Sequence, residues 1–216
     1  KVLLIDNNSS INIDIMNFLS IDCSTEIGSL FIKFKNKSFY KILQSHKYAN
    51  DLLVKKILDF LTENELTFDH LSNIFVNQGP GNFSGLRGSI AIAKGICLSK
   101  NIKLSGYDTF TWLGSKFFNK EDFIFSIIKH REKYYIKKID KQLKSTSKIE
   151  EITKEQIIKN YNNKFKVIAK NESKTFDKKI LELNNLQIID LNHEELEFLH
   201  LKGLLNEGLV KPYYLS

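Results

Sequence analysis

The sequence predicts a duplicated α/β protein in which each half holds a mixed β-sheet flanked by helices. The first half shows the patterns of three strands, a helix, a strand, a helix and a strand, and the second half partly repeats that order. The chain has 216 residues, enough for two small domains that each bury a core, and 42% of its residues are hydrophobic. We expect the boundary near 107–112, which gives domains over 16–107 and 108–216.

The first half is expected to begin with an antiparallel meander, because three short runs rich in Ile, Phe, Leu and Tyr are joined by tight turns. A helix with an apolar stripe follows, and then a buried strand, a glycine-rich loop, a second helix and a short strand. In order, these elements cover Phe18–Asp22, Gly28–Phe34, Ser38–Leu43, 48–61, Ile74–Val76, the helix to about Leu98, and 103–106.

The second half is expected to close with a helix over 194–206 that ends at Gly208 in a left-handed cap. Residues 1–15 are expected to be a non-native or over-long N-terminal extension, because the only methionine, Met16, directly precedes the first strand. The alternative is a native strand over Val2–Ile5. The other predicted elements are strands at 123–128, 134–139, 148–152, 165–169 and 186–190 and a helix at 154–160.

The composition narrows the class of protein. The formal net charge is +7, lysine supplies nearly all of the positive charge because Arg87 and Arg131 are the only arginines, and no lysine cluster marks a nucleic-acid groove. Cys23 and Cys97 are too few for a disulfide scaffold or a zinc site, so both are expected to be reduced. With no run near the roughly 20 apolar residues of a membrane span and no signal-peptide pattern, we expect a cytoplasmic protein without membrane contact.

The segment Gly79–Gly88 places four of the ten glycines between a buried strand and a helix. Such a junction can bind an anion, because backbone N–H groups point outward at a positive helix end. The spacing excludes a Walker loop and a dinucleotide fingerprint, since Lys94-Gly95 comes late and reversed and Gly85 follows Gly81 by four positions. A tight turn is the favoured interpretation, with Ser84 as the N-cap of the helix, and a phosphate site is the alternative.

Other polar residues offer weaker candidates. Asp22, Ser24 and Thr25 follow the first strand and could form a vestigial phosphate or metal site, although an Asx- or Ser-type turn is the favoured interpretation. His193 and His200 are expected to lie solvated on a helix face, and no histidine pair has the spacing of metal ligands. No serine sits in a nucleophile elbow, so we assign no catalytic residue and no metal ligand.

Two helices of the first half have apolar faces that are wide for their length. Such a face usually packs in a core, which is the favoured interpretation, and the excess width could instead mark a helix-pair interface with a partner. The candidate partner-interface residues are Leu53, Ile57, Phe60, Leu86, Arg87, Ile90, Ala93, Lys94 and Cys97.

Four motifs along residues 17–216 resemble those of the TsaB (YeaZ) family. Phe18–Thr25 is similar to the family's opening strand and Ile-Asp-Thr-Ser turn, and Ala93-Lys94-Gly95 and Val210–Leu215 match its helical Ala-Lys-Gly and closing Val-x-Pro-x-Tyr-Leu. The most specific match is to Gly-Pro-Gly-Ser-Phe-Thr-Gly-Leu-Arg, with Asn82 and Ser84 as mild departures. The signature-loop residues are Gly79, Pro80, Gly81, Phe83, Ser84, Gly85, Leu86 and Arg87.

Some family features are missing. Ser45–Tyr48 only partly fits the family's His-Ser-Glu triplet. In the second half, Lys129–Arg131 keeps only the arginine of the family's Asp-Ala-Arg, and Tyr134–Ile136 replaces its Glu-Val-Tyr. These departures put a role for the second half in doubt and leave the match of the first half unaffected.

The resemblance implies two tandem actin-like (ribonuclease-H-like, ASKHA) lobes and a non-catalytic scaffold subunit of the complex that forms threonylcarbamoyladenosine (t6A) in tRNA. It implies a heterodimer with the catalytic subunit TsaD, a ternary complex with the ATPase TsaE, tRNA contacted through the complex, and a homodimer when the chain is alone. No cofactor is expected on this chain, and ATP and metal are expected on the partner subunits. The alternative is an actin-fold ATPase or kinase that uses Asp22 and the loop Gly79–Arg87, a hypothesis weakened by the lack of glycine in Val167–Asn171.

Overall fold

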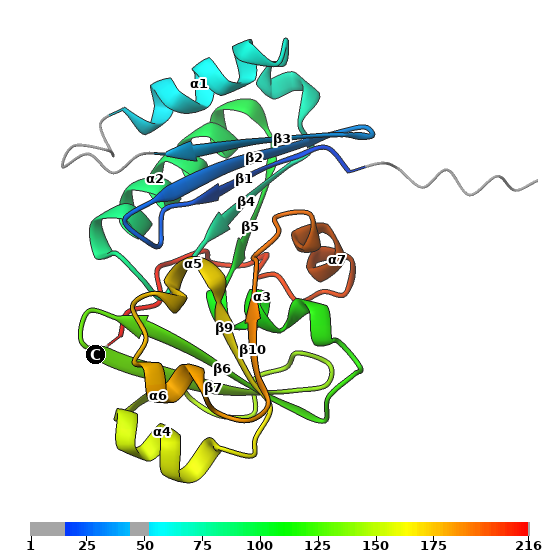
Figure 1. The fold of residues 1–216 in the computed structure, drawn as a ribbon. Helices are drawn as coiled ribbons and strands as arrows, with labels where there is room; N and C mark the ends of the chain where they lie inside the picture. The colour runs from blue at the N-terminus through cyan, green and yellow to red at the C-terminus, as the bar shows by residue number, and fades with distance from the viewer. Residues whose placement is uncertain (1–15, 44–51, 216) are drawn as a thin grey trace, which may run out of the picture.

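The computed structural model describes residues 16–43 and 52–215, which fold into two mixed five-stranded sheets, one in each half of the chain (Figure 1). The strand order is β3-β2-β1-β4-β5 in the upper sheet of Figure 1 and β10-β9-β6-β7-β8 in the lower one. Each sheet combines antiparallel and parallel pairs, and helices flank both, so the predicted fold class is confirmed. The expectations for residues 1–15, for Ser45–Tyr48 and for the start of the first helix lie outside the described residues.

The first sheet is built around a central strand that is buried on both faces, which explains its nearly continuous apolar sequence. β1 runs antiparallel to β2, with Phe18 opposite Lys33, and parallel to β4, with Phe18 opposite Asn73. The predicted meander is therefore present. The strands are β1 (Phe18–Asp22), β2 (Gly28–Phe34), β3 (Lys37–Leu43), β4 (Asn73–Asn77) and β5 (Lys103–Tyr107).

Two helices, α1 (Leu53–Glu63) and α2 (Phe83–Lys100), cover one face of this sheet (Figure 1). Leu19 of β1 packs on that face in one core cluster with residues of both helices. Phe18, the next residue along the strand, belongs to a second cluster that reaches into the other half of the chain. The alternation along β1 thus separates the helix-covered face from the face that joins the two halves.

The second half repeats the strand plan and adds short helices that the sequence did not predict. α3 is buried along its whole length between the two sheets, and α5 and α6 have four residues each. These segments are too short for a hydrophobic period to identify. The elements are α3 (Thr109–Gly114), β6 (Phe123–His130), β7 (Lys133–Asp140), β8 (Glu150–Ile152), α4 (Lys154–Tyr161), β9 (Lys166–Ala169), α5 (Lys170–Ser173), α6 (Lys178–Leu181), β10 (Leu186–Ile189) and α7 (Glu195–Leu201).

The closing helix α7 is shorter than the predicted 194–206, and its left-handed cap is Gly203 (φ +66°), not Gly208. The amide of Gly203 donates to the carbonyl of His200, and the amide of Leu204 donates to that of Leu199. This pair of bonds ends the helix and satisfies two of its last carbonyl groups. The prediction of Gly208 was wrong because an earlier glycine already allows the left-handed turn.

A buried histidine ties the two halves together, which corrects the expectation that His193 is solvated. Its Nδ1 lies 2.9 Å from the hydroxyl of Ser20 on β1, and its Nε2 lies 2.9 Å from that of Ser29 on β2. The ring stacks on Phe31 and contacts Trp112 of α3. Burial lowers the pKa of His193 to about 3, so the ring is neutral at physiological pH. His200 is half-buried on α7.

The C-terminal segment returns to the first sheet. Asn206 and Gly106 of β5 exchange both backbone hydrogen bonds, and the amide of Tyr213 donates to the carbonyl of Gln78. The side chain of Gln78 donates to the carbonyl of Lys211 at 2.7 Å. The family-like tail thus forms part of the wall around the glycine-rich loop.

Lys166 is a fully buried lysine at the start of β9. Its ammonium donates to four backbone carbonyls, those of Tyr161, Asn162, Lys164 and Asn184, at 2.6–2.9 Å. Burial lowers the pKa of Lys166 to about 8, so the amine is still protonated at neutral pH. The charge ties the end of α4 to the segment that precedes β10.

Lys166→Met is expected to lower the free energy of unfolding by about 3 kcal/mol, because it leaves buried carbonyl groups without a donor. Urea denaturation followed by circular dichroism measures the change. Lys164→Met, at an exposed position two residues earlier, is the matched control and should change stability by less than about 0.5 kcal/mol. Equal losses in the two variants would contradict a structural role of the Lys166 ammonium.

Candidate functional site

The glycine-rich loop joins β4 to α2, and Asn82 caps the helix in place of Ser84. The Oδ1 of Asn82 accepts hydrogen bonds from the amides of Ser84 at 3.1 Å and Gly85 at 3.2 Å. The helix therefore begins at Phe83, two residues earlier than expected. Arg87 therefore lies in the second turn of α2, where the positive end of the helix acts on its charge only weakly.

The backbone of the loop lies directly against the turn between β1 and β2. A Cβ atom added at Gly81 would lie closer than 3.0 Å to the carbonyl of Ser24, and one at Gly85 equally close to that of Cys23. The amide of Asn82 donates to the Ser24 carbonyl at 2.6 Å. The glycines are required by this close approach.

These contacts use several of the amides that a phosphate at this helix start would need. The amide of Gly79 (φ +100°) donates to the Asn77 side chain at 2.8 Å, those of Ser84 and Gly85 donate to Asn82, and the amide of Leu86 donates to the carbonyl of Asn82. An anion site at a helix start depends on amides that are free to meet the ligand. The geometry therefore favours the tight-turn interpretation over the phosphate site.

Asp22 and Ser24 form an Asx-type turn at the end of β1. The Oδ1 of Asp22 accepts from the amide of Ser24 at 2.9 Å and from the side-chain amide of Asn77 at 3.1 Å. Thr25 turns away and donates to the carbonyl of Ile27. In residues 16–43 and 52–215 no group of three or more His, Cys, Asp or Glu side chains is arranged to hold a metal ion. Burial raises the pKa of Asp22.

The second half contributes a carboxyl group that the sequence analysis missed. Glu172 follows β9 on α5, and its Oε2 is buried with no hydrogen-bond partner among the described residues. Burial, and then the charge of Asp22, raise the pKa of Glu172 to about 7. Two carboxyl groups thus influence each other across the junction of the halves, which disfavours a bound phosphate there. No motif in the sequence marks this glutamate.

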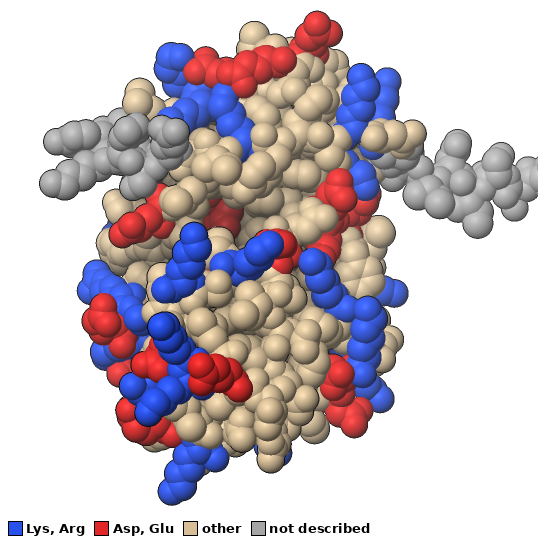
Figure 2. Space-filling view, viewed as in Figure 1, with Lys and Arg blue, Asp and Glu red and all other residues tan. Residues whose placement is uncertain are grey.

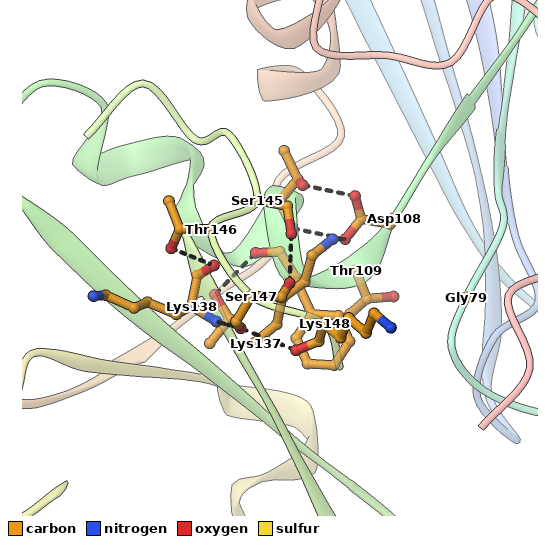
Figure 3. Close-up of polar contacts among 12 residues, drawn as sticks. Gly79, Asp108, Thr109, Lys137, Lys138, Ser145, Thr146, Ser147 and Lys148 are labelled. Carbon is orange, nitrogen blue, oxygen red and sulfur yellow. Dashed lines mark hydrogen bonds and ion pairs between the residues drawn. The ribbon is translucent and has the colours of Figure 1, made fainter. Parts of the chain in front are cut away.

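The loop is also attached to the start of the second half (Figure 3). The amide of Thr109 donates to the carbonyl of Gly79 at 3.0 Å. Asp108 caps α3 by accepting from the amide and the hydroxyl of Thr111, and Lys137 of β7 approaches its carboxylate at 3.4 Å. Figure 3 shows this pair beside the loop 145–148, which binds the backbone of Lys138. The glycine-rich loop is therefore bonded to residues of both halves, Ser24 in the first and Thr109 in the second.

The structure places most of the candidate interface residues in the core, which agrees with the favoured interpretation of the two apolar stripes. The apolar stripes of α1 and α2 pack against the sheet, so their side chains cannot reach a partner. Arg87 is exposed and Lys94 is half-buried. The candidates that lie buried are Leu53, Ile57, Phe60, Leu86, Ile90, Ala93 and Cys97.

The outward faces of the same helices carry exposed apolar residues together with Arg87, one of the candidates. On α1, Val54 and Leu58 are exposed one turn apart. On α2, an exposed stripe runs along one face, and a Cβ added at its glycine would meet open space. This stripe consists of Arg87, Ala91, Gly95 and Leu98. We call these six residues the outer helix face.

Lysines are interspersed with Asp and Glu over the face of the molecule shown in Figure 2, without a continuous basic stripe. Several of them form exposed ion pairs, such as Lys133–Glu151 and Lys170–Asp190. The absence of a basic stripe on this face agrees with the lack of a lysine cluster in the sequence. No helix in the described part of the chain is long and apolar enough to cross a membrane.

Comparison with known proteins decides the family. The profile of the family described as "TsaD: tRNA N6-adenosine threonylcarbamoyltransferase" matches residues 44–161, more than half of the chain. The chain belongs to this family. The match covers α1, the glycine-rich loop, α2 and the strands β6–β8 of the second sheet.

Curated relatives place the chain with the TsaB (YeaZ) members, which confirms the resemblance found in the motifs. The tRNA threonylcarbamoyladenosine biosynthesis protein TsaB of Buchnera aphidicola subsp. Schizaphis graminum is 30% identical over 106 residues, 47% of this chain and 49% of that protein. TsaB of B. aphidicola subsp. Baizongia pistaciae is 32% identical over 85 residues, 39% of this chain and 38% of that protein. The chain thus matches about half or less of the length of these relatives.

Solved structures show the same fold. YeaZ from Pseudomonas aeruginosa superposes with a TM-score of 0.69 and 16% identity over 93% of this chain and 100% of that one. A second P. aeruginosa structure, described as similar to the peptidase YEAZ, has a TM-score of 0.70 at the same identity and coverage. The two mixed sheets flanked by helices are therefore those of YeaZ, consistent with tandem actin-like lobes.

Gly81→Ala is expected to destabilise the protein by about 3 kcal/mol or more, because the added methyl group would collide with backbone that cannot move aside. Gly95→Ala is the matched control, since its methyl group meets open space on α2 and alanine favours the helix by up to about 1 kcal/mol. Thermal unfolding should shift in opposite directions in the two variants. A neutral Gly81→Ala would contradict the close approach of the loop to Ser24.

Glu172→Gln should stabilise the protein in a pH-dependent way. In the folded protein the pKa of Glu172 is about 7, above the ordinary value for glutamate, so the wild type loses stability as the pH rises from about 4 to 7. The glutamine variant has no group that titrates there and does not lose this stability. The gain should be small at pH 5 and reach roughly 1–3 kcal/mol at pH 8, measured by urea denaturation. Glu182→Gln, at an exposed position, is the control. A gain that does not depend on pH would contradict the raised pKa.

Proposed function

We propose that this chain is a non-catalytic subunit of the t6A-forming complex that pairs with TsaD and holds it in its active conformation. The observation that carries the proposal is the outer helix face, an exposed apolar surface on α1 and α2 in a chain of the TsaD family. The names of the curated TsaB relatives support t6A formation as the process. The proposal extends what those names say to this chain.

The geometry of the loop supports a role without catalysis. The amides of Gly79, Asn82, Ser84 and Gly85 are bonded within the protein, and Glu172 adds a carboxyl group near Asp22. Neither arrangement suits a nucleotide phosphate, so the actin-fold ATPase or kinase is not favoured. In this proposal the chain needs no cofactor of its own, and ATP and metal belong to TsaD and TsaE. The tRNA is then reached through the complex.

The outer helix face has the features of a helix-pair interface. Leu58 is 46% exposed and Leu98 is 86% exposed, and burial of one such side chain contributes on the order of 1.5–3 kcal/mol. On α2, the small exposed residues Ala91 and Gly95 leave room for a partner helix to approach closely. Exposed apolar residues on the outward face of a helix pair favour a protein partner, because the contact removes their surface from water.

Leu58→Asp and Leu98→Asp are expected to weaken binding to TsaD by at least tenfold each, because each buries a charge in an apolar contact. Leu201→Asp, at a position on α7 that is 73% exposed, is the matched control and should bind normally. Isothermal titration with purified TsaD measures the affinities. Thermal unfolding should show all three variants folded, because the three positions are exposed.

The outcomes separate the hypotheses. Wild-type binding to TsaD that is lost in the two outer-face variants supports the scaffold role, and t6A formation by the reconstituted complex should fall with it. If the wild type shows no affinity for TsaD and hydrolyses ATP alone, the proposal is wrong. If Leu201→Asp weakens binding as strongly as the other two, the interface lies elsewhere.

A further inference from the structure

Arg87 stands out among the charged residues on the outer helix face. Its guanidinium carbon lies 5.1 Å from the centre of the Phe83 ring, one helical turn earlier on α2. The Phe83 ring lies 5.1 Å from the ring of Tyr214 in the C-terminal tail. Both rings are more than half exposed. We call these three side chains the Arg87 stack.

The stack holds the arginine without neutralising it. None of the ion pairs within the described ranges involves Arg87, and its guanidinium instead makes a cation–π contact with the ring of Phe83. A guanidinium over an aromatic ring loses part of its freedom but keeps its N–H groups available at the edge. The side chain is thus arranged to receive a further acceptor.

The identity of the residue points to the chemistry of that acceptor. Of the 32 basic residues in the chain, only Arg87 and Arg131 are arginines. Lysine suffices for exposed charge, whereas the planar fork of arginine binds both oxygens of a carboxylate at once. An arginine held on an aromatic ring at the end of an apolar face is therefore suited to a carboxylate on a protein partner.

The charge of α2 supports the same partner. The helix carries Arg87, Lys94 and Lys100 and contains neither aspartate nor glutamate, and of these three cations only Lys100 forms an ion pair within the described residues, with Asp69 at 3.8 Å. On α1, by contrast, Lys55 pairs with Asp59 one turn later. The side of the outer helix face formed by α2 is therefore positive, and a complementary surface must be acidic.

We infer that the Arg87 stack is a receptor for a carboxylate on the partner subunit and that it favours an acidic partner over a second copy of this chain. In a two-fold pair the same patch occurs on both sides, so two copies would bring two positive α2 helices into one interface. A partner with carboxylates at the facing positions removes that repulsion and fills the fork of Arg87. The inference rests on the proposed function, because it names the contact through which TsaD is selected.

Arg87→Lys is the decisive variant, because it keeps the charge and removes the fork. It is expected to weaken binding to TsaD about tenfold, and Arg87→Glu more strongly, in isothermal titration at low salt. Arg131→Lys, which changes the other arginine at the exposed turn between β6 and β7, is the matched control and should bind as the wild type does. Both positions are exposed, and thermal unfolding confirms that the three variants fold.

A second experiment tests the aromatic support. Tyr214→Ala should weaken binding to TsaD severalfold, whereas Leu209→Ala, which removes another exposed side chain of the same tail, should not. Sedimentation of the chain alone should show self-association that strengthens from 50 to 500 mM salt, while binding to TsaD weakens over the same range.

The outcomes distinguish this inference from the proposed function. If the wild type binds TsaD and Arg87→Lys binds equally well, the receptor is wrong and the scaffold role stands. If the wild type does not bind TsaD, the proposed function itself is wrong. If self-association is as tight as binding to TsaD and both weaken with salt, the charge on α2 does not choose between the partners.

Discussion

The close contact between the Gly79–Gly85 backbone and the β1–β2 turn is the constraint on which the arrangement of the first half depends. Gly81 and Gly85 approach carbonyls of the turn at distances where no Cβ atom fits. The contact fixes where α2 begins, and α2 in turn packs its apolar stripe onto the sheet together with α1. Because the helix cannot rotate without losing this contact, the outer helix face is set by the loop.

The same contact explains why a loop that resembles a phosphate cradle is a structural joint here. Four amides of the loop and the helix start, those of Gly79, Asn82, Ser84 and Gly85, donate to Asn77, to Asn82 and to the Ser24 carbonyl. On the opposite side of the junction, Glu172 shares its electrostatic environment with Asp22. This region thus helps to hold the halves together, with the His193 hydrogen bonds and the C-terminal tail as further ties.

The sequence predicted the parts of the fold that follow from local patterns. β1 and β2 were placed to the residue, since apolar runs and tight turns define them. α3 and α5 were missed because their sequences are too short for a hydrophobic period, and their helical form depends on packing between the halves. His193 was judged solvated from a polar stretch of sequence, although its partners Ser20 and Ser29 lie more than 160 residues away.

The candidate site shows the limit of periodicity more clearly. The stripe that contains Ile57 and Ile90 was visible in the sequence, but one sequence does not say whether a wide stripe faces a core or a partner. Leu58 and Leu98, which the structure exposes, had no pattern that separated them from the stripe. Glu172 was missed because the charge that perturbs it belongs to Asp22, 150 residues earlier.

Apolar burial and charge have different consequences on the outer helix face. In the proposed pairing, Leu58 and Leu98 would supply a contact that any apolar helix face can satisfy, including the same face of a second copy, so they would contribute affinity without selecting a partner. Selection requires a group whose burial is costly unless the partner supplies its complement. We propose Arg87 as that group, because the desolvation penalty of a guanidinium without an acceptor exceeds the stabilisation from the Phe83 ring beneath it. A rigid position matters as much as the charge, since a flexible lysine could swing away from a wrong partner. Arg87 stacks on Phe83, whose ring contacts Tyr214 of the tail, and in the proposed pairing a surface without a facing carboxylate would leave the guanidinium desolvated and unpaired.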